Sequence, residues 1–346
     1  MIVDNEIKLD YSDVLIVPRE SELSSRSQVD LEVEHYGDSV IPIIAANMDG
    51  VGTFAMARKL ANYKIMTALT KHYSLEDLIE FYSEKDSHYA FYSMGTNQDD
   101  YSKFVEFDRI CRDNDLDKPI GICIDVANGY TRNFETFVSK MSENYPNYVL
   151  MVGNVVTPER TEKLIEAGAD IVKIGIGPGS VCTTRRLAGV GYPQFSAVLE
   201  CAAAADAAGG SIVADGGITC PGDAAKAFAA GAKYVMLGGY LAAHEEGLPP
   251  ERMDKVEYMS NVPFYGMASK AAQELHNGGV AEYRASEGKE VILKYRGPVD
   301  NTIKELLGGI RSACTYVGAE DISQLHRKTK FVKVNRVLNN VFGNAS

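Results

Sequence analysis

The sequence predicts a closed α/β barrel of the (β/α)8, or TIM-barrel, class, with an N-terminal extension and a long cover segment after the eighth strand. Short runs rich in β-branched residues alternate with longer helical stretches along the chain. No hairpin signal lies between these runs, which favours parallel strands joined by helical crossovers. Eight such units fit the roughly 250 residues typical of this fold. An open, doubly wound sheet is the alternative.

The eight expected strands are short and mostly apolar, and they are Val40–Ala46, Ile65–Leu69, Tyr89–Met94, Ile120–Asp125, Tyr148–Val152, Ile171–Ile174, Ser211–Ala214 and Tyr234–Leu237. The helices expected between them are Thr53–Asn62, Leu75–Glu84, Tyr101–Asp113, Thr131–Asn144, Pro158–Ala167, Gln194–Ala208 and Gly222–Ala230. A long glycine-rich loop separates the sixth strand from the next helix. Residues 1–39 precede the first expected strand. Residues 245–298 follow the eighth, and a loop of that length is usually functional, so we expect a mobile active-site cover with a helical centre at Lys270–Leu275.

Composition narrows the class of protein. The 346 residues are 45% hydrophobic and 24% charged, as in an ordinary globular protein, and we expect a single barrel domain spanning residues 1–346. The formal net charge of −12 argues against a nucleic-acid partner, because a broad acidic surface repels a phosphate backbone. We find no membrane span and no export signal, and we therefore expect a cytoplasmic location. No CxxC occurs among the six cysteines, so reduced thiols are expected.

In a barrel of this class the active site lies where the strands end. The candidates at those positions are Asn47–Asp49, Lys71–His72, Asp125, Gly153–Asn154, the loop Gly175–Tyr192, Asp215–Gly217 and Gly238–Gly239. The two Gly-Gly pairs follow strands seven and eight, where such barrels often bind phosphate through loop amides. Either pair alone could be a tight turn, but their occurrence after both strands favours a phosphate site. Asp215 is better placed to accept hydrogen bonds from ribose hydroxyls than to cap the helix at Gly222.

The strongest local signal is the loop Gly175–Arg185, which carries Cys182 near Arg185 and the start of a helix. Positive potential there favours the nucleophilic thiolate, so Cys182 is the candidate nucleophile rather than a buried small residue. The alternating glycines could also turn several backbone carbonyls toward a bound cation. Cys111, Cys123 and Cys201 are expected in the core, and Cys220 and Cys314 on loops. His72 and Glu287 taken alone suggest a structural histidine and a solvated charge.

Longer motifs resemble a known family. The loop Gly175–Thr184 is similar to the catalytic cysteine loop of the IMP dehydrogenase and GMP reductase family. Several further stretches resemble its GMP reductase branch in particular: Gly189–Gln194, Asp215–Gly217, Asp125–Tyr130, Gly153–Val156, Gly278–Gly288 and Gly308–Gly318. The resemblance extends from Ile7 to about Val334. No regulatory domain pair is inserted after Leu69, and the Arg-Tyr dyad of dehydrogenases is not found after Gly288.

The resemblance implies a reaction in which GMP and NADPH give IMP, ammonia and NADP. Cys182 would add to purine C2 and form a thioimidate, while Thr184 and Glu287 would handle the proton of the departing amine. The nucleotide site implied by the motifs comprises Ser180, Asp215, Gly216, Gly217, Gly238, Gly239, Gly266, Met267, Ala268, Arg284, Ala285, Ser286 and Gly288. The implied cofactor site comprises Ser25, Arg26, Lys71, Asp125, Val126, Ala127, Ile176, Gly177, Met267, Tyr283, Arg284, Ser312, Ala313, Cys314 and Thr315.

The resemblance also implies an assembly and a cation. Ser25–Arg26 and Ser312–Thr315 resemble residues that reach a neighbouring subunit's cofactor, which implies a homotetramer. A potassium ion would be held by the loop at Gly177, Gly179, Cys182 and Arg185. The family commonly has serine where this chain has Ala268, and Ser269 or a backbone amide could replace that contact. Thr70 also departs from the family, which often has histidine there.

Three other functions stay open on the sequence. An IMP dehydrogenase without regulatory domains would use the same cysteine for oxidation and hydrolysis. A phosphosugar isomerase or lyase would use the phosphate site without nicotinamide. A nucleotide-binding scaffold would bind GMP without turnover, although Cys182, Thr184 and Glu287 argue against it.

Overall fold

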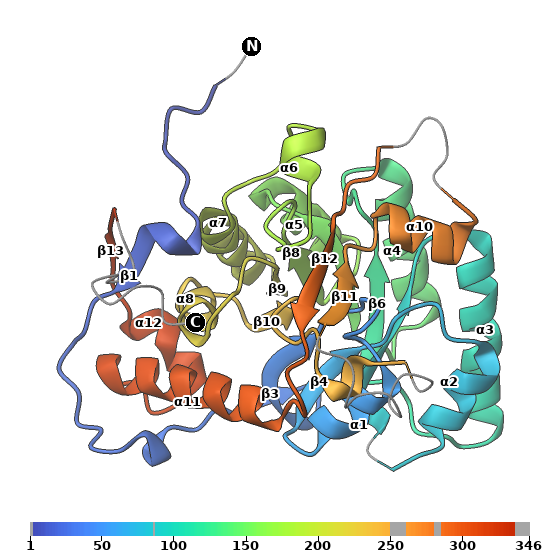
Figure 1. Ribbon diagram of the computed structural model, residues 1–346, viewed down its shortest axis with the longest axis horizontal. Coiled ribbons are helices and arrows are strands. Elements are labelled where there is room, and N and C mark those ends of the chain that lie inside the picture. Colours follow the sequence, from blue (N-terminus) through green and yellow to red (C-terminus); the bar gives the residue numbers. More distant parts are fainter. Residues whose placement is uncertain (1–2, 86, 250–260, 280–284, 336–346) are drawn as a thin grey trace.

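The computed structural model describes residues 3–85, 87–249, 261–279 and 285–335, and its centre is a closed barrel of parallel strands (Figure 1). Each strand pairs with the next in chain order, and β10 pairs with β3 to close the ring. The barrel strands are β3 (Asp38–Ala45), β4 (Ile65–Ala68), β5 (Ala90–Met94), β6 (Gly121–Asp125), β7 (Leu150–Val155), β8 (Ile171–Ile174), β9 (Ser211–Asp215) and β10 (Tyr234–Leu237). The predicted barrel is therefore confirmed, with every expected strand present.

The helices lie outside the barrel and follow the predicted alternation. They are α1 (Phe54–Ala61), α2 (Leu75–Tyr82), α3 (Gln98–Asp113), α4 (Arg132–Asn144), α5 (Pro158–Glu166), α7 (Gln194–Ala207), α8 (Pro221–Ala229) and, after the cover, α11 (Asp300–Val317). Short polar side chains fix several starts: the side chains of Thr53, Ser74, Asn97 and Thr131 each accept a backbone N–H from the first turn. A four-residue helix, α6 (Thr184–Leu187), lies in the loop after β8.

The N-terminal extension is more structured than the sequence predicts. It contains β1 (Val14–Ile16) and β2 (Val33–His35), with the turns η1 (Tyr11–Asp13) and η2 (Arg26–Gln28), so the first strand does not begin after residue 39. Strand β1 pairs antiparallel with β13 (Phe331–Lys333), and β2 pairs antiparallel with β3. Three-residue strands carry too few alternating positions to be recognised by periodicity.

The cover segment combines a helix with a pair of antiparallel strands. The expected helix is confirmed as α10 (Lys270–Asn277), and it lies between β11 (Asn261–Tyr265) and β12 (Glu290–Lys294). These two strands pair antiparallel although α10 separates them, so no short turn marks the pair in the sequence. Figure 1 shows the pair in orange in front of the barrel strands, with α10 beside it. The remaining short elements are η3 (Ser87–Tyr89), η4 (Glu245–Gly247), η6 (Ile322–Gln324) and α12 (Leu325–Lys328).

The core is the barrel interior together with the layer between strands and helices. All residues of β4, β8 and β10 are buried, and Ile43, Ile44, Phe91 and Tyr92 are among the fully covered side chains. None of the helices in the described part of the chain has the length and hydrophobicity that a bilayer span requires. The packed interior leaves the carboxyl ends of the strands, under the cover, as the place for a ligand.

Candidate active site

A cavity of about 1220 Å³ lies at the carboxyl ends of the barrel strands. Its floor consists of residues at or just beyond the ends of β3, β4 and β6–β10, and the cover supplies one wall through residues such as Phe264, Met267 and Leu293. This volume exceeds the roughly 300–1000 Å³ typical of a site for one small ligand. The cavity is therefore large enough for two ligands side by side.

Cys182, Thr184 and Glu287 meet in this cavity although Glu287 is distant in sequence. The Cys182 thiol donates to the Thr184 hydroxyl (Sγ to Oγ1, 3.3 Å), which donates to the Glu287 carboxylate (Oγ1 to Oε2, 2.8 Å). The backbone holds the same segments together, because the Thr183 amide donates to the Glu287 carbonyl at 3.2 Å. The Lys289 amide also donates to the Val181 carbonyl, at 2.9 Å. The three side chains form a continuous path for a proton between sulfur and carboxylate.

Arg185 packs against the cysteine loop and connects it to neighbouring segments. Its guanidinium bonds the Asp10 carboxylate at 3.1 Å and the Tyr192 carbonyl. Its side chain packs against Gly177 and Gly191, and a Cβ at Gly177 would lie only 2.5 Å from the Arg185 Cγ. Gly177 also has a φ of +86°, a left-handed conformation that favours glycine. The glycine spacing that marks this loop in the sequence thus makes room for the arginine that holds it.

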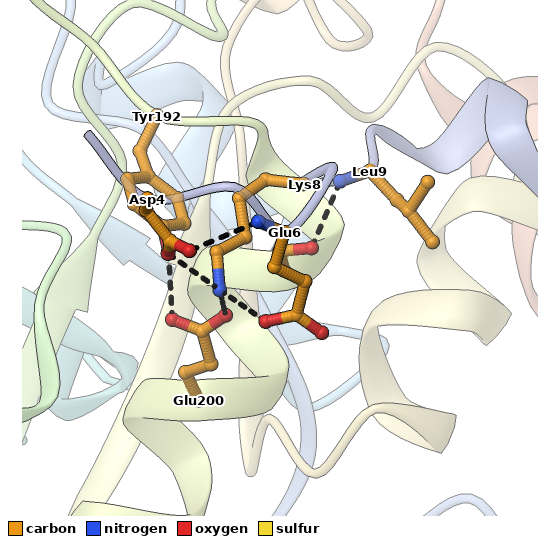
Figure 2. Close-up of polar contacts among 7 residues, drawn as sticks. Asp4, Glu6, Lys8, Leu9, Tyr192 and Glu200 are labelled. Carbon is orange, nitrogen blue, oxygen red and sulfur yellow. Dashed lines mark hydrogen bonds and ion pairs between the residues drawn. The ribbon is translucent and has the colours of Figure 1, made fainter.

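The N-terminal arm, residues 4–10, continues this support. Leu9 forms two hydrogen bonds with Ser196 of α7: its amide donates to the Ser196 hydroxyl, and its carbonyl accepts from the Ser196 amide. Lys8 lies among the carboxylates of Asp4, Glu6 and Glu200 (Figure 2). Asp10 accepts the Gln194 amide at 2.6 Å as well as Arg185. The arm therefore connects α7 to the loop that carries Cys182.

Both Gly-Gly pairs line the cavity. Gly216 and Gly217 have φ angles of +90° and +80°, so their place after β9 is a requirement of the backbone. A Cβ at Gly239 would lie 2.5 Å from the Ser180 hydroxyl, which shows how closely the cysteine loop approaches the end of β10. Backbone amides at such bare positions can approach an anion closely.

A buried lysine, Lys173 of β8, joins two of the predicted carboxylates. Its ammonium forms an ion pair with Asp125 at the end of β6 and lies 3.3 Å from Asp215 at the end of β9. Burial lowers the pKa of Lys173, but the two carboxylates outweigh that effect and the net pKa is raised. Burial raises the pKa of Asp125, but the Lys173 charge and hydrogen bond lower it by more. The net pKa of Asp125 therefore lies below its ordinary value. Sequence reasoning missed Lys173 because it lies inside an apolar strand and counted as core.

A second group missed by sequence reasoning ties the cover to the barrel rim. Asp49 accepts hydrogen bonds at 2.6 Å from His276 of α10 and at 3.0 Å from the Tyr265 hydroxyl of β11. The His276 ring stacks on His72 with centroids 3.4 Å apart. Burial, with a smaller contribution from His276, lowers the pKa of His72 to about 4. Asp49 and His72 were both at expected strand ends, but only the fold reveals their partner His276.

The cavity collects most, but not all, of the residues expected at the two sites. Those lining it are Lys71, Asp125, Val126, Ala127, Ile176, Gly177, Gly179, Ser180, Asp215, Gly216, Gly217, Gly238, Gly239, Gly266, Met267, Ala268 and Ala285, together with the three proposed catalytic residues. Gly288 forms isolated bridges with Cys182 and Ser269 nearby, whereas Ser286 does not line the cavity. Tyr283 and Arg284 lie outside the described residues.

The remaining expected cofactor residues lie elsewhere. Exposed Ser25 and Arg26 belong to the turn at η2, which packs against α11, and α11 carries residues 312–315. None of these lines the cavity. Cys314 is buried within α11, which continues without a break through Gly308 and Gly309, so the expectation of a loop position was wrong. Cys111, Cys123 and Cys201 are buried as expected.

The departure at Ala268 has a structural consequence. Ala268 is exposed in the cavity wall, and the neighbouring Ser269 is buried. The Ser269 hydroxyl caps α10 by accepting the Ala272 amide at 3.2 Å. The Ser269 hydroxyl therefore caps the helix, and replacement of the ligand contact at position 268 by Ser269 or by a backbone amide stays a prediction.

Comparison with known proteins identifies the family and several relatives of this chain. Residues 8–338 match the protein family described as "IMP dehydrogenase / GMP reductase domain". The chain is 52% identical over 356 residues to a protein of Aeromonas hydrophila named GMP reductase, covering 99% of each chain. It is 50% identical over 353 residues to a GMP reductase of Vibrio cholerae and 49% identical over 354 residues to one of Shewanella pealeana, again covering 99% of each chain.

Proposed function

The chain belongs to the IMP dehydrogenase/GMP reductase family, and we propose that it reduces GMP to IMP with NADPH and releases ammonia. The observation that carries this proposal is the hydrogen-bonded path from Cys182 through Thr184 to Glu287 at the wall of one large cavity. Replacing an amine by hydrogen at purine C2 needs a nucleophile for the carbon and a proton for the departing nitrogen. This path provides both from one set of side chains.

The geometry suggests how the proton moves. As the Cys182 thiol proton passes to Thr184 and the Thr184 proton passes to Glu287, sulfur becomes a thiolate and Glu287 a neutral acid. The thiolate adds to C2, and the exocyclic nitrogen receives the stored proton back through Thr184. The C2–N bond then breaks and ammonia leaves, while the C2–S bond of a thioimidate remains. The proton lost by the thiol is the one gained by ammonia, so this half-reaction is balanced without another acid.

Reduction completes the cycle at the same carbon. The reduced nicotinamide supplies a hydride to C2 when it is bound. The C2–S bond then breaks with its electron pair on sulfur, IMP leaves, and the Cys182 thiolate takes up a proton from water to restore the thiol. The chain's task in this step is to hold the nucleotide against Cys182 with C2 facing the cofactor side of the cavity.

Two parts of the cavity suit the two ligands. We assign the nucleotide phosphate to the amides around Gly216–Gly217 and Gly238–Gly239 and its ribose to Asp215. We assign the cofactor to Lys71, Asp125–Ala127 and Ile176–Gly177, which line the same cavity. A volume of about 1220 Å³ accommodates both at once.

We also propose a monovalent cation at the cysteine loop, as the resemblance implies. Among the described residues no group of His, Cys, Asp and Glu side chains could hold a metal ion, so the ligands would be backbone carbonyls. The Gly179 carbonyl already accepts the Cys182 amide at 3.1 Å, and its second lone pair remains able to bind a cation. Gly177, Cys182 and Arg185 would supply the other loop oxygens. Replacing potassium by sodium should lower turnover, and an unchanged rate would contradict the site.

The residues outside the cavity belong to a proposal about assembly. Ser25, Arg26 and residues Ser312–Thr315 of α11, of which Cys314 is buried, would complete a cofactor site in a neighbouring subunit of a homotetramer. We further propose a single domain spanning residues 1–346, without a regulatory insertion, and a mobile cover over residues 245–298, of which 250–260 and 280–284 lie outside the described residues. Sedimentation of the full chain tests the assembly, and a monomer at assay concentrations would contradict the shared site.

The experiment that tests the function follows NADPH absorbance with GMP while ammonia is measured in parallel. We expect equal amounts of NADPH consumed and ammonia released, and Cys182→Ala should remove both. Reduction of NAD with IMP serves as the control. Activity in that control alone would identify an IMP dehydrogenase, whereas GMP binding without turnover would identify a nucleotide-binding scaffold.

A further inference from the structure

Lys173 lines the cavity and is the most deeply buried charged side chain among the described residues. Its side chain is 2% exposed, and it projects from β8 between the ends of β6 and β9. Neighbouring Gly153 makes room for it, since a Cβ at Gly153 would lie 2.6 Å from the Lys173 Cβ. A third polar group, the Asn47 amide oxygen, lies 3.5 Å from the ammonium. Local structure is thus arranged around this one side chain.

The Lys173 ammonium forms ion pairs with both carboxylates, Asp125 and Asp215. The ammonium binds Oδ1 of Asp125 and lies 3.3 Å from Oδ2 of Asp215, where Asn154 also donates at 2.8 Å. Removing an ammonium from water costs several kcal/mol, and only close partner charges offset that cost. One positive charge faces two negative ones, so neither carboxylate is fully neutralised and both can still accept a ligand hydroxyl.

Asp125 and Asp215 also face the cavity, with side chains 37% and 21% exposed. Asp125 adjoins Val126–Ala127, whereas Asp215 adjoins Gly216–Gly217. The proposed function assigns Asp125 to the cofactor half of the cavity and Asp215 to the nucleotide half, and Lys173 contacts both.

We propose that Lys173 is a positioning residue that couples the nucleotide half of the site to the cofactor half through Asp215 and Asp125. This inference rests on the proposed function, which assigns one carboxylate to each ligand. When one carboxylate loses its charge, the ammonium pairs more strongly with the other one. The remaining carboxylate then becomes a weaker acceptor for a ribose hydroxyl, because more of its charge is neutralised by Lys173. A change on the cofactor side thus alters nucleotide affinity even when no cofactor is bound, and the reverse holds as well.

The test measures GMP binding by calorimetry in the absence of any cofactor. Asp125→Asn should weaken GMP binding by about three- to tenfold, within the range for directly coupled neighbours. In the Lys173→Met background the same substitution should no longer weaken it, because the shared charge is gone. The matched control is Asp100→Asn, which removes a carboxylate lying 3.4 Å from Lys71 and should leave GMP affinity unchanged.

The reciprocal arm keeps the test decisive if Lys173→Met fails to fold. Asp215→Asn should weaken binding of NADP to the chain without nucleotide by a similar factor. Unchanged GMP affinity in Asp125→Asn, or an equal loss with and without Lys173, would overturn the coupling. Absence of GMP binding by the unaltered chain is a different result, since it would refute the proposed function and with it the premise.

Discussion

Thr184 links the nucleophile to the carboxylate through one hydroxyl group. It accepts from the Cys182 thiol and donates to Glu287, so every proton moved between them crosses its oxygen. Thr184→Val keeps the side-chain shape and removes that oxygen. We expect turnover to fall by roughly 10²–10⁴-fold, the usual contribution of a positioned proton-transfer group. Thr183→Val is the matched control, because the Thr183 hydroxyl is buried and has no hydrogen-bond partner in the described structure.

The role proposed for Glu287 belongs to ammonia release and not to hydride transfer, so the two steps can be measured separately. Glu287→Gln removes the stored proton, which ammonia release needs and hydride transfer to a preformed adduct does not. We expect the release of ammonia to slow much more than the hydride step when the two are followed by rapid quench and by NADPH absorbance. Equal slowing of both steps would mean that Glu287 only shapes the site.

At the scale of elements, one carboxylate, Asp49, contacts both α10 and β11 of the cover. Asp49 accepts from His276 of α10, from Tyr265 of β11 and, at 3.3 Å, from Thr70 after β4. Asp49→Ala should free both cover elements at once. We expect faster hydrogen exchange in β11 and α10 and a KM for GMP raised several-fold, while exchange in the barrel strands stays slow.

The control for this element lies on the same helix. Lys270→Ala removes an exposed ion pair with Glu274 (3.5 Å) that does not reach the rim, and exposed pairs of this kind contribute little. Exchange in the cover should match the unaltered chain in Lys270→Ala. Slow exchange in Asp49→Ala as well would show that hydrophobic contacts such as those of Phe264 hold the cover instead.

The N-terminal arm makes a comparable prediction for the cysteine loop. Asp10→Asn weakens the contact with Arg185, which packs over Gly177, so the loop should lose order while the barrel stays folded. We expect kcat to fall several-fold with little change in the thermal midpoint. Lys8→Met, in the same arm but directed toward Glu200 (Figure 2), should leave kcat unchanged. If both substitutions lower kcat equally, the arm as a whole and not the Asp10–Arg185 contact orders the cysteine loop.

At the scale of the whole molecule, the sequence predicts the barrel because each strand and helix repeats one recognisable pattern. Strands Ile171–Ile174 and Tyr234–Leu237 match β8 and β10 at both ends, and the resemblance identified Glu287, which composition alone would have dismissed. What escaped prediction depends on contacts between distant segments. The pairs β1–β13 and β11–β12, the stack of His72 on His276 and the ion pairs of Lys173 leave no mark on local periodicity.

Acid stability is a property of the whole barrel that depends on His35 in β2. This side chain is completely buried, with Nδ1 2.8 Å from the Tyr234 hydroxyl. Burial, helped by the Lys233 charge, lowers its pKa from 6.5 to about 4, so the folded chain keeps His35 neutral where the unfolded chain takes up a proton. The free energy of unfolding should therefore fall as pH drops from 6.5 toward 4, by about 3 kcal/mol in total from this group.

Chemical denaturation across this pH range checks the contribution of His35. His35→Gln should be less stable than the unaltered chain at pH 7, because a buried ring that fits its surroundings is lost, but its stability should fall less steeply below pH 6.5. Tyr234→Phe removes the hydrogen-bond partner and keeps the imidazole, so it should lower stability while preserving the steep slope. If His35→Gln keeps the full slope, the acid sensitivity of the barrel comes from other groups, of which His72 beneath the cover is the first to test.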